Sequence, residues 1–146
     1  MKIQAKLAES ADDLDTCLRL RWTVFVEEQG VRPSLEVDAH DRTAAVHALV
    51  LHDGIPCGAA RFIFTAPGQA KIQRMAVIDD ARGSGAGREL LRFLEEEAAR
   101  RGAVRFTLDA QVQARAFYEK AGYTAHGPLF DDAGIPHQAM SKERSP

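Results

Sequence analysis

Apolar and polar positions along the chain follow two periods, one typical of strands and one typical of helices. Apolar residues at every second position predict strands over residues 2–7 and 104–108, and apolar segments between turn signals predict strands over 46–51, 57–65 and 70–78. Helical spacing predicts amphipathic helices over residues 11–27, 85–101 and 112–121. Residues 123–142 predict two more strands, separated by a break at Gly134-Ile135-Pro136. This order of elements predicts a mixed sheet flanked by helices, as in α+β or α/β proteins.

Two local signals refine this pattern. Ser10 and Asp13 have the spacing of a capping box, in which the serine accepts a backbone N–H and the acidic side chain reaches back. In the fourth predicted strand, Ile72 lies on one parity while Met75 and Val77 lie on the other. A change of phase by one residue predicts a β-bulge, although a strand buried on both faces would also alternate weakly.

Composition is that of an ordinary globular domain, and we expect a single domain over residues 1–146, because this length can bury about 70% of the unfolded surface. A net charge of −2 gives no basic field for nucleic acid. No run approaches the roughly 18 apolar residues of a membrane span. The N-terminus lacks the apolar core of a signal peptide, so a cytoplasmic location is expected. Cys17 and Cys57 fit no metal or disulfide spacing and are expected to be buried, inert thiols.

The segment Arg82-Gly83-Ser84-Gly85-Ala86-Gly87-Arg88 carries the clearest chemistry of the chain. It follows a predicted strand and leads into the helix over 85–101. Glycines at alternate positions let the backbone approach a ligand closely, and a helix N-terminus directs free N–H groups and positive dipole toward an anion. The two arginines add guanidinium groups suited to phosphate oxygens. The segment therefore predicts a phosphate or diphosphate site, with a glycine-rich helix start that binds nothing as the alternative.

Two other nucleotide motifs fit this segment poorly. A Walker A loop requires Lys-Ser/Thr after its last glycine, but Gly87 is followed by Arg88-Glu89. In a Gly-x-Gly-x-x-Gly dinucleotide motif that starts at Gly83, the third glycine would stand where the chain has Arg88. Another kind of nucleotide- or phosphate-binding module remains an open hypothesis.

Two motifs carry a resemblance to the GNAT acyltransferases. Arg82-x-x-Gly85-x-Gly87 resembles their Arg/Gln-x-x-Gly-x-Gly/Ala signature, and Phe117-Tyr118-Glu119-Lys120-Ala121-Gly122-Tyr123 resembles the later Phe-Tyr-x-x-x-Gly-Phe/Tyr motif. Other segments resemble the small ElaA-like or YjcF-like bacterial branch, namely 24–29, Asp38, Asp41, His47, 110–111 and 134–137. Over essentially the whole chain, the resemblance implies an α+β fold of GNAT type, with a mixed, mostly antiparallel central sheet of six to seven strands and about four helices.

The resemblance also implies a cofactor, acetyl-CoA, and the residues that hold it. The loop would bind the pyrophosphate, the strand at Met75 would serve the pantetheine arm, and an N–H at the bulge would act as a one-donor oxyanion hole. The implied cofactor-binding residues are Met75, Ala76, Val77, Arg82, Gly83, Ser84, Gly85, Ala86, Gly87, Arg88 and Gln111. Tyr118 matches the family's general acid, which protonates the departing thiolate. The alternative for Tyr118 is a core aromatic residue.

The general base is not assigned by the resemblance. Many family members use a carboxylate near the strand of Met75, but Lys71-Ile72-Gln73-Arg74-Met75 has none. The candidates for the base are Glu27, Glu28, Asp109 and His137. Of these, Glu28, Asp109 and His137 are also taken as candidate substrate residues. For each, the alternative is a solvated or capping side chain. Asp109 stands where related sequences more often carry histidine or asparagine.

The loop over 29–43 holds three acidic residues, Glu36, Asp38 and Asp41. This region borders the acceptor site in the family, so the three are expected to form an acidic rim that attracts a cationic amine. A solvated loop is the alternative.

Taken together, the resemblance implies an enzyme that needs no metal and transfers an acetyl or short acyl group from acetyl-CoA to a primary amine of a small molecule or peptide. Direct attack by the amine in a ternary complex is expected. The second hypothesis is an acyl-CoA-binding or sensor domain without turnover, which the missing carboxylate favours. Relatives that pair through strands near the C-terminus suggest a homodimer.

Overall fold

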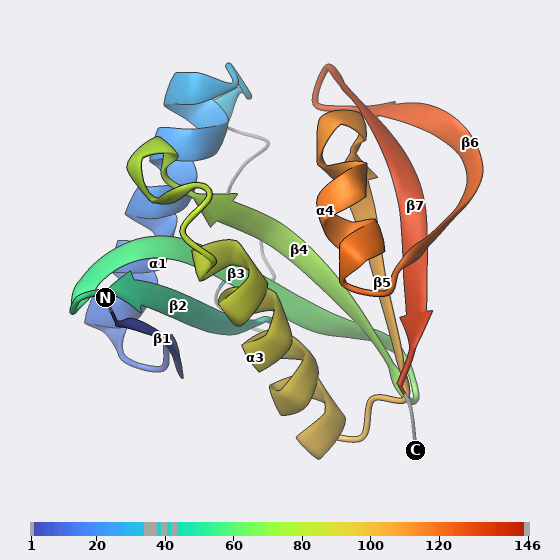
Figure 1. The fold of residues 1–146 in the computed structure, drawn as a ribbon, viewed down its shortest axis with the longest axis horizontal. Coiled ribbons are helices and arrows are strands. Elements are labelled where there is room, and N and C mark those ends of the chain that lie inside the picture. The colour runs from blue at the N-terminus through green and yellow to red at the C-terminus, as the bar shows by residue number, and fades with distance from the viewer. Residues whose placement is uncertain (1, 34–37, 39–40, 42–43, 145–146) are drawn as a thin grey trace.

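The computed structural model describes residues 2–33, 38, 41 and 44–144, and a seven-stranded sheet forms its centre (Figure 1). The strand order is β1-β2-β3-β4-β5-β7-β6, and every neighbouring pair is antiparallel except β4 and β5. The strands are β1 (Ile3–Leu7), β2 (Val46–His52), β3 (Ile55–Ala66), β4 (Gln69–Val77), β5 (Arg105–Gln111), β6 (Thr124–Asp132) and β7 (Ile135–Glu143). The predicted α+β fold with a mixed, mostly antiparallel sheet is confirmed.

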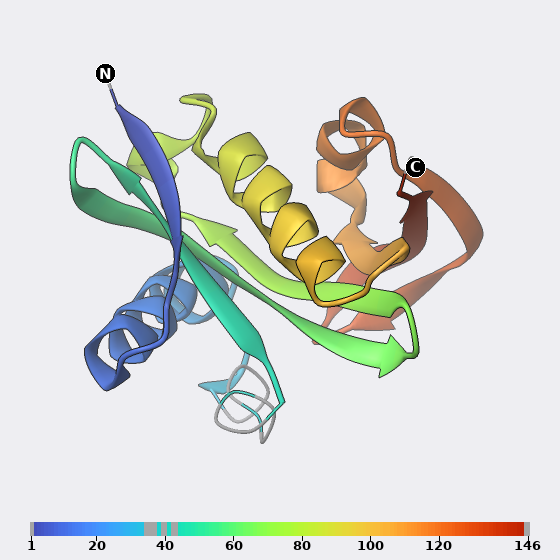
Figure 2. The same ribbon diagram turned by 90° about the horizontal axis from the view of Figure 1, so that it is seen from below.

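Helices cover both faces of this sheet, with α1 on one face and α3 on the other (Figures 1 and 2). The helical elements are α1 (Ala11–Arg21), η1 (Trp22–Glu28), η3 (Asp79–Ala81), α3 (Ala86–Arg100), η4 (Val112–Ala114) and α4 (Arg115–Lys120). None of the helices in the described ranges is long and apolar enough to cross a membrane.

The predicted helix over 11–27 is correct only as far as Arg21. Its Ser10 cap is confirmed, because Ser10 Oγ accepts the Asp13 N–H at 3.0 Å, while the Asp13 carboxylate pairs with Lys6 at 3.2 Å. After Arg21 the chain continues as the π-helix η1, and the Gln29 N–H donates to the carbonyl of Val24, five residues back. The β-branched residues of this segment are weak α-helix formers, so a change from α-helical to π-helical geometry costs less here.

The main core lies between α3 and the sheet. Leu90, Leu91 and Leu94 of α3 are fully buried against apolar side chains that alternate along the central strands, among them Val50, Ala60, Phe62, Ile72, Phe106 and Leu108. A smaller cluster under α1 contains Ala8, Cys17, Leu49 and Ala59. Cys17 and Cys57 are buried free thiols, and burial raises the pKa of Cys17 to about 12. The prediction that both thiols are buried and form no disulfide is therefore confirmed.

The predicted β-bulge in β4 is also confirmed. Arg61 of β3 pairs with Gln73, and Ala59 pairs with Ala76. The two pairs are two residues apart along β3 but three residues apart along β4, so β4 contains one extra residue. Arg74 sits at the extra position with a φ of 57°, in the left-handed region that non-glycine residues rarely adopt. The bulge bends β4 just before its end.

Beyond the bulge, β4 and β5 separate. Their parallel pairing runs only from Gln69 with Arg105 to Ile72 with Leu108, and the two strands then diverge (Figure 1). We call the gap between residues 73–77 of β4 and 109–111 of β5 the fork. It opens at the carboxyl ends of two parallel strands, which is where ligands commonly bind in such sheets.

Candidate active site

The loop between η3 and α3 presents unpaired backbone donors beside the fork. Gly83 and Gly85 have φ values of 81° and 92°, so a larger residue would be strained at either position. Ser84 Oγ accepts the Ala86 N–H at 3.2 Å and thereby caps one donor of α3. Within the described ranges, no acceptor lies in hydrogen-bonding geometry to four neighbouring N–H groups, those of Gly83, Gly85, Gly87 and Arg88. Four free donors at a helix N-terminus form a cradle for an anion.

The two arginines of the loop differ in their surroundings. Arg88 is exposed in the first turn of α3 and forms no ion pair with any described residue. A cation is unfavourable at the positive end of a helix dipole, so a bound anion would relieve this arrangement. Arg82 instead donates to Val77 O at 2.9 Å and to the Glu28 carboxylate at 2.9 Å. Its charge is largely compensated, and Arg88 is the better candidate for contact with phosphate.

Gly87 brings three parts of the candidate site together. A Cβ atom at this position would lie 3.4 Å from Phe117 Cζ and 3.7 Å from Val77 Cγ2. The start of α3 therefore packs closely on α4 and on the end of β4. This contact places the anion cradle, the fork and the helix of Tyr118 next to one another.

The bulge sets which backbone donors of β4 face the fork. The Ile78 N–H donates to Cys57 O at 2.9 Å, on the β3 side. Hydrogen bonds of an antiparallel strand repeat every second residue, so Ala76 also faces β3, whereas Met75 and Val77 face the fork. The Val77 carbonyl is taken by Arg82. The Met75 and Val77 N–H groups thus face the fork, and the Met75 N–H, next to the bulge, can serve a ligand there.

Tyr118 lies half-buried in α4, where it makes edge-on ring contacts with Phe117 at 5.1 Å and Tyr123 at 6.0 Å between centroids. Burial raises the pKa of Tyr118 to about 12, which keeps the phenol protonated at neutral pH. None of the described residues hydrogen-bonds to its hydroxyl, whereas the Tyr123 hydroxyl donates to Glu95 at 2.8 Å. The Tyr118 proton is thus available to a ligand.

Two of the candidate substrate residues, Glu28 and Asp109, form ion pairs. Glu28 pairs with Arg82 at 2.8 Å, and Asp109 pairs with Lys71 at 2.8 Å. Asp109 alternates along β5 with the core residues Leu108 and Ala110, so its side chain lies on the α1 face of the sheet, at the apex of the fork. Neither carboxylate is a free base in this arrangement.

His137 has one ring nitrogen, Nε2, to which none of the described residues hydrogen-bonds. Its Nδ1 lies 2.7 Å from Ile135 O, and because a carbonyl only accepts hydrogen bonds, Nδ1 carries the proton and Nε2 carries the lone pair. The ring is largely buried and stacks on Phe130 at 5.9 Å between centroids. His137 pairs across strands with Gln111, and directly paired residues share one face of a sheet. It therefore faces the same side as Asp109.

Gln111 bridges the open end of the fork. It donates to Gln29 Oε1 at 2.9 Å and accepts from Gln29 Nε2 at 3.2 Å. Gln29 follows η1, so this pair links the N-terminal half of the chain to the end of β5. A contact between Gln111 and a cofactor remains a prediction.

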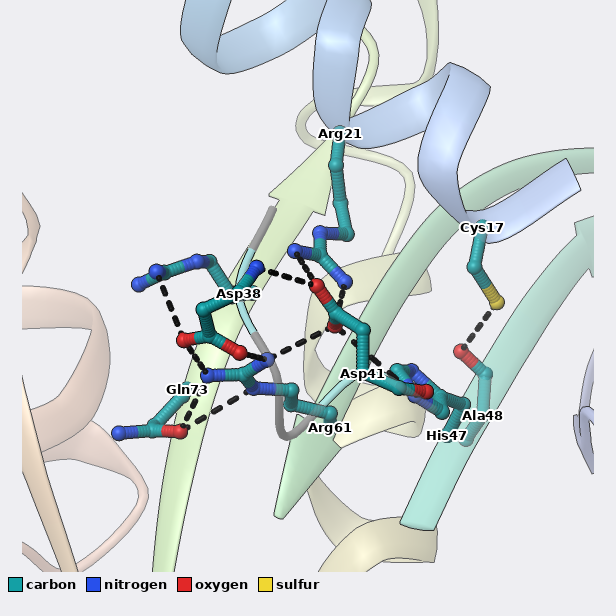
Figure 3. A network of polar contacts seen from close by, with 9 residues as sticks. Cys17, Arg21, Asp38, Asp41, His47, Ala48, Arg61 and Gln73 are labelled. Atoms are coloured by element: carbon teal, nitrogen blue, oxygen red, sulfur yellow. Dashed lines mark hydrogen bonds and ion pairs between the residues drawn. The ribbon is translucent and has the colours of Figure 1, made fainter. Parts of the chain in front are cut away.

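The expected acidic rim is wrong for the two residues that can be placed, and Glu36 lies outside the described residues. The Asp41 side chain is fully buried and accepts from Arg21 at 2.6 Å and Arg61 at 2.7 Å (Figure 3). Burial alone would raise the pKa of Asp41, but hydrogen bonds from Arg21, the Asp38 N–H and Arg61 hold it well below its usual range. Asp38 pairs with Arg61 and Arg74. Both carboxylates are held in ion pairs with arginines, of which Arg21 and Arg61 are buried, and so do not form the expected acidic rim.

Sequence reasoning missed Arg21 and Arg61 as the partners of these aspartates. Both are 1% exposed, and His47 joins the same cluster through Nε2, which lies 2.8 Å from the Asp41 carbonyl. The available signal was an arginine inside an apolar strand, since Arg61 stands between Ala60 and Phe62. A buried charge needs a partner of opposite sign.

Comparisons with known proteins agree with this geometry. The family model described as "Acetyltransferase (GNAT) domain" matches residues 17–144. The uncharacterized N-acetyltransferase YjcF of Bacillus subtilis is 36% identical over 97% of this chain and 100% of its own. Escherichia coli ElaA has a TM-score of 0.83 and 26% identity, over 97% of this chain and 99% of its own. An acyl-CoA N-acyltransferase from Pseudomonas aeruginosa has a TM-score of 0.80 and 28% identity, over 97% and 98%. The chain belongs to the GNAT acetyltransferase family.

Proposed function

We propose that the protein transfers an acetyl or short acyl group from acetyl-CoA to the primary amine of a small molecule or peptide. The observation that carries this proposal lies at the start of α3, next to the fork. There, four N–H groups and the Arg88 side chain have no partner among the described residues. Family membership supports the same reaction class.

The residues present fit acetyl-CoA. The loop over 82–88 would hold the pyrophosphate through its backbone N–H groups and Arg88. The strand segment of Met75, Ala76 and Val77 would lie along the pantetheine arm, with the Met75 and Val77 N–H groups facing it. When bound, acetyl-CoA supplies an acyl thioester whose carbonyl an amine can attack. Gln111 would contact the cofactor at the open end of the fork, after release from Gln29.

The chain supplies three groups for the transfer. The Met75 N–H would donate to the carbonyl oxygen where negative charge develops. Tyr118 would donate its proton to the departing thiolate, since its buried phenol stays protonated at neutral pH. His137 Nε2 would accept a proton from the acceptor amine. Of the three candidate substrate residues, it is the one whose basic atom is not held in an ion pair.

A second candidate function is an acyl-CoA-binding domain without turnover, favoured by the ion pairs that hold Glu28 and Asp109. The two functions are separated by measuring release of the CoA thiol from acetyl-CoA with a broad panel of amines, from amino acids to polyamines and short peptides. The proposed enzyme releases the thiol well above the rate of hydrolysis with at least one amine. Binding of acetyl-CoA without release from any amine supports the second function instead.

Arg88→Glu should weaken binding of CoA by about 10- to 100-fold, since a hydrogen bond to a charged group contributes about 1.5–3 kcal/mol. The same change should leave Tm unchanged or slightly higher, because an acidic residue is favourable in the first turn of a helix. Arg19→Glu is the matched control, as it changes net charge equally on the exposed side of α1, across the sheet from α3. Calorimetric titration with CoA measures both variants, and equal affinity in Arg88→Glu and Arg19→Glu would contradict the assignment.

His137→Asn should lower kcat by about 100-fold, within the range of a lost general base. The asparagine amide can still donate to the Ile135 carbonyl, so the strand end should stay in place. We expect unchanged Tm and an unchanged Kd for acetyl-CoA. A kcat equal to that of the wild type would exclude His137 as the base.

A further inference from the structure

Arg61 stands in the middle of the apolar strand β3 and is fully buried. All five of its N–H groups are used (Figure 3). Nε and one N–H of Nη2 donate to Gln73 Oε1 at 3.1 and 2.9 Å. The others donate to the two Asp38 oxygens, both at 2.7 Å, and to Asp41 at 2.7 Å. Because a guanidinium is a rigid planar fork, it fixes these three partners relative to one another.

Two of these partners, Gln73 and Asp38, lie at the bulge of β4. Gln73 is paired directly with Arg61 and is the last residue before the register changes. The next residue, Arg74, has a φ of 57°, and its guanidinium lies 3.4 Å from Asp38 Oδ2. A non-glycine residue keeps such a conformation only where its surroundings enforce it. Arg61 thus hydrogen-bonds directly to Gln73, the residue before the bulge. It is linked to the side chain of Arg74, the bulge residue, through Asp38.

The bulge decides where the Met75 N–H points. With the extra residue, Ala76 is paired with Ala59, and Met75 faces the fork. Without it, the register that joins Arg61 and Gln73 would continue and place Met75 opposite Ala59. The Met75 N–H would then face β3 and be lost to a ligand in the fork.

We propose that Arg61 is a positioning residue for acyl transfer, which holds Gln73 and Asp38 so that the bulge directs the Met75 N–H into the fork. The catalytic consequence rests on the proposed function, but the conformational consequence can be measured in the protein without any ligand. This role would also account for the presence of the Arg61 charge in the core, where burial of a charge is costly. A well-packed apolar residue can match a buried ion pair in stability, but it cannot hold three polar partners in one geometry.

The test compares Arg61→Met with Arg21→Met. Arg21 is equally buried and donates to Asp41 at 2.6 and 3.1 Å, but it comes from α1 and, among the described residues, makes no hydrogen bond to Gln73. Amide resonances and hydrogen exchange of residues 73–75 are followed in the ligand-free variants. In Arg61→Met we expect shifted resonances for these residues and slower exchange at Met75. In Arg21→Met we expect the wild-type pattern at Met75, with a lower Tm in both.

The two variants should also differ in kcat. Arg61→Met should lower kcat by about 10- to 100-fold, approaching the loss seen when an oxyanion donor is removed, with KM for acetyl-CoA changed little. Adding Arg74→Gly to Arg61→Met should restore the wild-type Met75 resonance and raise kcat by about tenfold, because glycine adopts positive φ freely. Arg21→Met should keep the wild-type kcat.

A folded Arg61→Met with the wild-type resonance at Met75 would overturn the proposal, as would an equal shift in Arg21→Met. If Arg61→Met does not fold, Gln73→Leu takes its place. This variant removes the hydrogen bonds between Arg61 and Gln73 of β4 but keeps the ion pairs of Arg61 with Asp38 and Asp41. The same shift at Met75 is then expected, and its absence overturns the proposal. If no amine supports turnover in the wild type, the proposed function fails, and the resonances still decide whether Arg61 holds the bulge.

Discussion

Tyr118→Phe should lower kcat by about 100- to 1000-fold and leave the Kd for acetyl-CoA unchanged, as expected for loss of a general acid. The change removes one hydroxyl, which hydrogen-bonds to none of the described residues. The ring contacts with Phe117 and Tyr123 remain, so the fold should be preserved. Steady-state turnover and calorimetric titration of the same preparation give the two quantities.

Tyr123→Phe is the matched control for this result. It also removes one phenol from the same aromatic cluster, but that hydroxyl donates to Glu95 at 2.8 Å. Because the acceptor is a carboxylate, we expect a loss of about 1.5–3 kcal/mol in the free energy of unfolding, and a wild-type kcat. Equal kcat values in Tyr118→Phe and the wild type would show that the thiolate is protonated by another group.

Asp41→Ala should lower the free energy of unfolding by about 3–5 kcal/mol, because two buried arginines would lose their shared carboxylate. Arg21 and Arg61 are each 1% exposed, so water cannot easily replace Asp41. At this chain length the loss corresponds to a fall in Tm of about 10 °C or more. Urea unfolding followed by circular dichroism gives the free energy directly.

Asp13→Ala provides the comparison with an exposed ion pair. Lys6 and Asp13 lie 3.2 Å apart, with side chains 47% and 26% exposed. Removal of such a pair costs about 1 kcal/mol or less. If Asp41→Ala were no more destabilising than Asp13→Ala, the buried cluster would contribute little to stability.

The features that local sequence could predict are those that local chemistry determines. The bulge was visible as a change of phase between Ile72 and Met75, and the structure places an extra residue there. The loop over 82–88 was visible from its glycines, since Gly83 and Gly85 do adopt positive φ. Three leucines at helical spacing marked α3, and they form the main core. Each of these signals depends on residues that are close together in the chain.

The features that sequence reasoning missed depend on partners far apart in the chain. Asp41 was expected at the surface, because nothing near it indicates that Arg21 and Arg61, both 20 residues away, would reach it. The change from α-helix to π-helix after Arg21 leaves no distinct periodicity over only seven residues. The ion pairs of Glu28 and Asp109 likewise follow from the meeting of separate elements.

The most direct test of the central claim is calorimetric titration of the wild-type protein with CoA, and in parallel with pantetheine, which lacks the pyrophosphate and nucleotide. If the loop at the start of α3 is a pyrophosphate site, CoA should bind at least about 100-fold more tightly than pantetheine, equivalent to two or more charge-assisted hydrogen bonds. ATP and NAD should bind far more weakly than CoA. Equal binding of CoA and pantetheine, or no binding of CoA at millimolar concentration, would contradict the account.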